Sequence, residues 1–315
     1  MGTGPARHGA APSAPAVPMA GRGAPHPWAR AALRLLCFGV LAVVGTVLAG
    51  GLLYTPLSTL AGVADLRVSL GSWFAVAGLL AAHAVCHRVF GEADGWERDG
   101  LGDAAWRPGQ LARAALAGAL VLLVPSLLLL AAGQLRIQPA AETGHGEAIL
   151  RLAALLVPAA LAEELALRGY PLTVLREAFG TRAALLLTSV AFGAVHLLNP
   201  APSLRAVAIV ALAGVWLGML RLATASLPAA WLAHLAFNAA QAMVLHAPVS
   251  GLALPTPGWR TVDAGPDWLT GGGWGPEGGA AVAAGMGVVT FLHARAARRR
   301  AAQTEPMSRR RAAEG

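Results

Sequence analysis

The sequence predicts an all-α fold, a polytopic membrane helix bundle of about eight transmembrane helices. The chain of 315 residues is 56% hydrophobic and only 13% charged, and its mean hydropathy is +0.58. A soluble domain would carry about 25% charged residues. Apolar stretches close to the roughly 20 residues that cross a bilayer recur from Leu35 to Leu292. The composition therefore excludes an ordinary soluble domain.

Eight apolar segments form the predicted spans, and the shorter ones need tilt or polar extensions to cross the membrane. In chain order they are residues 35–53, 70–85, 114–132, 149–162 with a helical continuation, 183–198, 206–220, 227–245 and 280–292. The last is short and rich in glycine, so seven spans remain the alternative. Gly180 follows a helical pattern and Thr181 can cap the next helix, which predicts a turn at residues 179–181.

The placement of the arginines predicts the topology. The chain has no lysine, and with the N-terminus inside, all arginines but five fall in loops or tails on the cytoplasmic side. The five outer ones are Arg67, Arg136, Arg151, Arg205 and Arg260. This asymmetry predicts that both termini are cytoplasmic. The net charge of +8 is thus a topology signal rather than a nucleic-acid-binding surface. The alanine-rich, lysine-free composition is typical of a bacterial protein, so we expect the bacterial cytoplasmic membrane.

Composition divides the chain into five parts. Residues 1–29 are a Pro/Ala-rich tail that we expect to be disordered, and residues 30–148 hold the first transmembrane helices. Residues 149–247 form the predicted catalytic core. Residues 248–279 are an outer loop rich in Gly, Pro and Trp, and residues 280–315 are the last helix with a basic tail. Trp259, Trp268 and Trp274 favour an interfacial loop, with a lid over the bundle as the alternative.

Polar residues inside apolar segments identify the candidate site. An ionisable group at a helix centre costs about 2.5–3.5 kcal/mol, so a chain usually keeps one for chemistry or transport. Glu164 and Arg168 are four residues apart and can pair on one helix face. Glu163 points about 100° away and remains free for another task. The turn at residues 179–181 would place Glu163 and His196 at similar depth on antiparallel helices.

Two further pairs occur on the following segments. Phe192 lies one helical turn before His196 and could keep its surroundings dry. His234 and Asn238 are again four residues apart and share a helix face. Taken singly, His196 could be a hydrogen-bonded core histidine. His234 and Asn238 could likewise be an interhelical hydrogen-bonding patch.

Together these residues resemble a known pattern. EELALR fits EExxxR, FGAVH fits FxxxH and HLAFN fits HxxxN, in that order on successive hydrophobic segments. The chain resembles the CPBP family, which comprises type II CAAX prenyl endopeptidases and bacterial relatives described as intramembrane metalloproteases, over about residues 149–245. The resemblance implies that Glu163 activates a water with help from His196, and that His234 and Asn238 bind the oxyanion. Glu164, Arg168 and Phe192 would support them.

The resemblance also raises the question of a metal. Glu163, His196 and His234 could be three ligands of a zinc ion with water in the fourth position. The sequence lacks HExxH, and we favour a glutamate-activated water over bound zinc. The expected partner is a membrane-embedded or membrane-associated peptide or protein, with no nucleic acid. The alternatives are a proton-coupled transporter and a non-catalytic scaffold or immunity protein. His83, Cys86 and His87 share one helical turn, but no carboxylate lies nearby in sequence.

Overall fold

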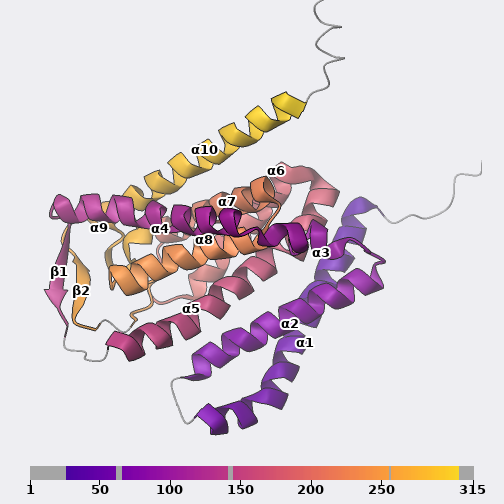
Figure 1. The fold of residues 1–315 in the computed structure, drawn as a ribbon, viewed down its shortest axis with the longest axis horizontal. Helices are drawn as coiled ribbons and strands as arrows, with labels where there is room; N and C mark the ends of the chain where they lie inside the picture. The colour runs from indigo at the N-terminus through magenta and orange to yellow at the C-terminus, as the bar shows by residue number, and fades with distance from the viewer. Residues whose placement is uncertain (1–25, 62–65, 141–144, 255–256, 305–315) are drawn as a thin grey trace, which may run out of the picture.

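The structure is a computed structural model that describes residues 26–61, 66–140, 145–254 and 257–304. Most of the predicted tail, residues 1–25, lies outside the described residues. As predicted, the fold is an all-α helix bundle (Figure 1). Its long helices are α1 (Pro27–Ala61), α2 (Leu66–Val89), α4 (Pro108–Ala131), α5 (His145–Arg168), α6 (Tyr170–Val195), α7 (Leu204–Thr224), α8 (Leu227–Ala239) and α10 (Ala280–Thr304).

The helices differ in how well they suit a bilayer. Within the described residues, four stretches are long and apolar enough to cross it, namely Pro27–Tyr54, Ser69–Val89, Pro108–Ala131 and Leu204–Thr224. The other predicted spans are also helical. However, α5 carries several charged residues, α6 is bent, α8 has 13 residues, and the apolar part of α10 is the shorter stretch Ala280–Arg295. The polar and bent helices are those that hold the candidate site.

The connection between α5 and α6 differs from the single predicted turn. The chain first breaks at Gly169, and α6 then bends at Gly180, whose φ of +81° is readily adopted by glycine. The predicted turn at residues 179–181 is therefore correct in place, but a short helical stretch precedes it. Gly169 packs tightly, because a Cβ there would lie 2.4 Å from His83 Nε2. The sequence predicted one hairpin with one turn, and it did not predict the break at Gly169.

The core of the bundle brings the motif-bearing helices together. α4 packs along α8, α6 along α7, and α5 against both α6 and α8, while α1 and α2 form a pair at one edge (Figure 1). The closest approach of α4 and α8 is at Gly118, where a Cβ would lie 2.0 Å from the carbonyl oxygen of Ala233. Only glycine permits this approach. The contact positions α8 at Ala233, the residue before His234.

Polar contacts join the segments that share a predicted side of the membrane. Arg34 forms ion pairs with Glu92 and Glu177, and Arg98 also pairs with Glu177. Arg221 donates a hydrogen bond to the carbonyl oxygen of Arg98 at 2.7 Å. These residues come from four segments predicted to be cytoplasmic. The contacts therefore agree with the predicted grouping of loops, while the side of the membrane stays a prediction.

The segments predicted to be outside also meet. β1 (Leu135–Pro139) and β2 (Trp259–Asp263) form a two-stranded antiparallel sheet, with Arg136 opposite Val262. This sheet was not predicted, because neither segment shows a long alternating pattern.

The predicted interfacial position of all three loop tryptophans is wrong for one of them. Trp268 is 57% exposed, but Trp274 is 5% exposed and packs in the cluster that contains Phe192. The outer segment is thus part of the core beside the site.

Candidate intramembrane active site

The Glu163–Glu164 pair on α5 divides into two environments. The side chain of Glu164 is fully buried, and its Oε1 atom accepts hydrogen bonds from Arg168 Nη1 and from His234 Nδ1, each at 3.0 Å. The side chain of Glu163 is 37% exposed, but its Oε2 atom is buried and has no hydrogen-bond partner among the described residues. Adjacent carboxylates on one helix face different surroundings because each residue turns the chain by about 100°. Glu164 is therefore held in a buried ion pair, and Glu163 is the candidate for the reactive carboxylate.

Arg168 contacts two residues of the site, Glu164 and Phe192. Its guanidinium is completely buried, pairs with Glu164, and lies 4.2 Å from the centre of the Phe192 ring. A cation over an aromatic face is attracted to the ring electrons. The predicted Glu164–Arg168 pair is therefore present, and it also connects α5 to the helix that carries Phe192.

His234 on α8 lies between the two carboxylates. Because Glu164 accepts a hydrogen bond from Nδ1, the other ring nitrogen, Nε2, turns toward Glu163, whose Oε2 is 3.8 Å away. That separation is too long for a direct hydrogen bond. A histidine held by one carboxylate and facing another has a fixed ring orientation, which is a common requirement of catalytic histidines.

His196 begins the short helix η2 (His196–Leu198), where α6 ends. Its Nδ1 atom donates a hydrogen bond to the carbonyl oxygen of Phe192 at 2.7 Å, which leaves Nε2 as the acceptor. The Phe192 ring contacts both imidazoles, with ring centres 4.9 Å from His196 and 5.8 Å from His234. Phe192 thus lies against both imidazoles.

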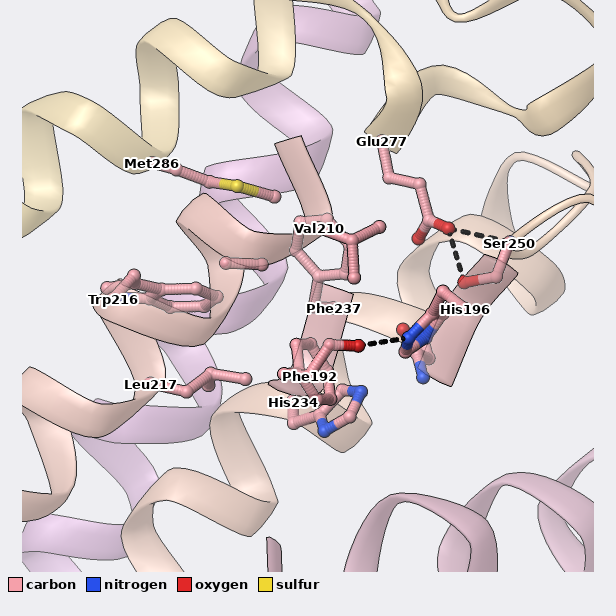
Figure 2. A pocket seen from close by; sticks show the side chains of 12 residues that line it. Phe192, His196, Val210, Trp216, Leu217, His234, Phe237, Ser250, Glu277 and Met286 are labelled. Carbon is pink, nitrogen blue, oxygen red and sulfur yellow. Dashed lines mark hydrogen bonds between the residues drawn. The ribbon is translucent and has the colours of Figure 1, made fainter. Parts of the chain in front are cut away.

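Phe192, His196 and His234 line a small cavity (Figure 2). Its polar wall is formed by His196, His234, Asn238, Ser250 and Glu277, and its volume is about 30 Å³. A cavity needs about 10–15 Å³ of space for the centre of a water-sized sphere to hold one water molecule. The cavity therefore suits one or two waters, the reactant that hydrolysis requires.

Two polar residues of this wall were missed by the sequence reasoning. Glu277 and Ser250 both come from the outer segment, and Glu277 Oε1 accepts hydrogen bonds from Ser250 N and Ser250 Oγ, each at 2.6 Å. Burial raises the pKa of Glu277, while the hydrogen bonds from Ser250 act in the opposite direction. The signal in the sequence was that Glu277 is the only charged residue between positions 268 and 292.

The structure brings together most of the predicted site residues, but not all of them. Glu163, His196, His234 and Asn238 were predicted to converge on one cavity. His196, His234 and Asn238 line it together with Phe192, but Glu163 is not among its lining residues. Glu163 was expected to work mainly with His196, whereas the structure places its Oε2 atom 3.8 Å from His234 Nε2. The catalytic roles themselves stay predictions.

The fit to a metal is poor. Among the described residues, no three His, Cys, Asp or Glu side chains are grouped so that they could hold a metal ion. The Nδ1 atoms of His234 and His196 are held by Glu164 and by the Phe192 carbonyl oxygen, which leaves Nε2 of each ring available as a ligand. The zinc site considered for Glu163, His196 and His234, as the alternative to a glutamate-activated water, is not preformed among the described residues.

The cluster around His83 also differs from the sequence reasoning. A carboxylate that is distant in sequence does approach it, because His87 Nε2 lies 2.9 Å from Asp99 Oδ2. However, His83 Nδ1 donates to the carbonyl oxygen of Leu79, and its Nε2 accepts from the backbone N–H of Tyr170. Both nitrogens of His83 are therefore occupied, and the cluster joins α2 to the start of α6.

Comparison with known families gives the same core. Residues 145–240 match the family described as type II CAAX prenyl endopeptidase Rce1-like. This range contains α5 to α8 and all three motifs. No curated protein and no solved structure matches the chain. The helical core that holds Glu163, His196, His234 and Asn238 is therefore similar to the type II CAAX prenyl endopeptidase Rce1-like family.

Proposed function

We propose that the chain is an intramembrane endopeptidase that hydrolyses a peptide bond of a membrane-associated substrate with a glutamate-activated water. The observation that carries this proposal is the free carboxylate of Glu163 beside His234, at a site whose water-sized cavity is lined by His196, His234 and Asn238. Hydrolysis needs a base for water and donors for the developing negative charge. Glu163 comes from α5, His196 from η2 at the end of α6, and both His234 and Asn238 from α8.

In this mechanism Glu163 accepts a proton from water as the water oxygen attacks the carbonyl carbon. The unprotonated Nε2 of His196 can accept a hydrogen bond from the same water and orient it. The carboxamide of Asn238 and the Nε2–H of protonated His234 donate to the oxyanion, with Glu164 as the counter-ion of the imidazolium. Glu163 then returns the proton to the leaving nitrogen.

The substrate and location follow from the same proposal. The partner would be a peptide or protein that is embedded in the bilayer or anchored to it, of the CAAX prenyl type or a bacterial equivalent. The protein would be a multi-pass component of the bacterial cytoplasmic membrane with both termini in the cytoplasm. If a zinc ion is required, Glu163, His196 and His234 would have to rearrange to bind it.

The decisive comparison is between cells that produce the parent and cells that produce Glu163→Gln. Glutamine keeps the size of the side chain but cannot accept the proton of the water. Quantitative proteomics of membrane peptides should show cleaved C-termini with the parent only. Identical peptide profiles, with both proteins present in equal amounts, would reject the protease and favour a scaffold or a transporter.

A further inference from the structure

Glu277 is a buried carboxylate for which the proposed mechanism has no use. It lies in the short helix η5 (Pro276–Gly278), which precedes α10, and only 4% of the residue is exposed. Its side chain projects from the outer segment toward His196 at the wall of the cavity (Figure 2). A carboxylate taken out of water is costly unless it is compensated, so its presence there requires a reason.

The carboxylate is held in a rigid frame. Ser250 donates two hydrogen bonds to Oε1, and Ser250 itself has a φ of +49°, which is uncommon outside glycine. Asn199, which follows η2, donates a hydrogen bond to the carbonyl oxygen of Ser250 at 3.0 Å. Next to Glu277, a Cβ on Gly275 would lie 2.1 Å from the carbonyl oxygen of Pro248. These contacts fix the position of Glu277 relative to His196.

The frame itself supplies no positive charge, and the groups that can lend one to Glu277 are His196 and His234 of the same cavity. Within the described part of the chain, Glu277 forms no ion pair with an arginine, whereas Glu164 has Arg168 at 3.0 Å. The two donors of Ser250 would be satisfied equally well by a neutral amide oxygen. The cavity that Glu277 lines therefore offers a place where a small cationic group would be stabilised by charge.

Peptide hydrolysis produces such a group. The water oxygen bonds to the carbonyl carbon, and the water proton that Glu163 returns makes the nitrogen positively charged until the C–N bond breaks. The new carboxylic acid then loses a proton and the free amine gains one, so the leaving group ends as an ammonium. We propose that Glu277 binds the amino group of the leaving peptide. This inference rests on the proposed function. For a CAAX-type substrate, the bound group would be the new N-terminus of the released tripeptide.

Two matched probes test the assignment. One is a quenched fluorescent peptide with a prenylated cysteine followed by three residues, and the other replaces the scissile amide with an ester. The ester releases a neutral alcohol, so it cannot form the ammonium. We expect Glu277→Gln to lower kcat on the amide about ten- to a hundredfold, as for loss of a charged hydrogen bond. On the ester, kcat should stay within about twofold of the parent.

Ser250→Ala is the matched control for a structural effect, because it removes one hydrogen bond of the frame and keeps the carboxylate. If Glu277 only holds Ser250 in place, Glu277→Gln and Ser250→Ala will both slow the two probes equally. Equal slowing by Glu277→Gln, or no slowing of the amide, would overturn the assignment.

A binding measurement does not depend on turnover. An aliphatic tripeptide with a free amine should raise the Tm of the parent more than its N-acetylated form does, and Glu277→Gln should lose this discrimination. If the parent cleaves neither probe, the proposed CAAX-type activity is rejected. The Tm measurement still tests whether Glu277 binds an amino group. If only the parent distinguishes the free amine from its N-acetylated form, the result supports the role of Glu277. If the parent does not distinguish them, that role is overturned.

Discussion

Replacing Glu164 with glutamine should destabilise the bundle more than the same change at its neighbour. Glu164 and Arg168 are completely buried, and the carboxylate also holds His234 at 3.0 Å. Glutamine leaves the charge of Arg168 without a counter-ion. Removing one partner of a buried ion pair costs about 3–5 kcal/mol of the free energy of unfolding. Because domains are stable by only about 5–15 kcal/mol, this loss would be large.

Glu163→Gln is the matched control, because the side chain of Glu163 is 37% exposed and pairs with no arginine in the part of the chain that the structure describes. A substitution at such a position typically changes stability by about 0.5 kcal/mol or less. The double variant Glu164→Gln/Arg168→Met removes both charges and should recover most of the lost stability. It should not recover hydrolysis, because His234 still lacks the carboxylate that orients its ring.

The assay is reversible unfolding in detergent micelles, followed by circular dichroism as a denaturing detergent is added. Two results would refute the reasoning. One is a Glu164→Gln variant as stable as Glu163→Gln, which would mean that Arg168 finds another counter-charge or water. The other is a double variant no more stable than Glu164→Gln, which would mean that the pair contributes through packing rather than charge.

Three further outcomes are expected. Glu163→Gln should abolish hydrolysis without lowering the Tm, as measured on one purified sample. Asn238→Ala should keep residual turnover, since losing one oxyanion donor typically costs about 10²–10³ in rate; complete loss would assign Asn238 another role. For Glu277, whose pKa burial raises above the ordinary 4.5, the folded state favours the protonated form. Stability should therefore fall as pH rises through the raised pKa, and Glu277→Gln should melt like the parent near about pH 4 but higher near about pH 8.

The motif residues could be predicted because helical periodicity is a local property. His234 and Asn238 are four residues apart, and an apolar sequence around them leaves little choice of structure. The bend at Gly180 was predictable for the same reason, since a glycine that ends a helical pattern is a local signal. These features need no information on how the helices are rotated against each other.

The partner of each carboxylate could not be predicted in this way. Equal depth on two helices suggested Glu163 with His196, but which residues meet also depends on rotation about each helix axis. That rotation is set by close approaches such as Gly118 against Ala233, which no single segment reveals. Glu277 was missed because its segment is rich in glycine and has no periodicity. Its position follows from long-range contacts with Ser250.

The distribution of charge also bears on the transporter alternative. A proton-coupled transporter needs a polar path that water can reach from both sides in turn. On the side of α5 toward Arg168, the path from His234 ends in the Glu164–Arg168 pair, and neither of those side chains is exposed. On the other side, the cavity of about 30 Å³ meets the rigid frame of Glu277 and Ser250. The buried Glu164–Arg168 pair closes one end of this polar path, and the cavity has room only for water. With the partly exposed Glu163 beside His234, this arrangement suits one reaction on one substrate better than the passage of protons and solutes through the bundle.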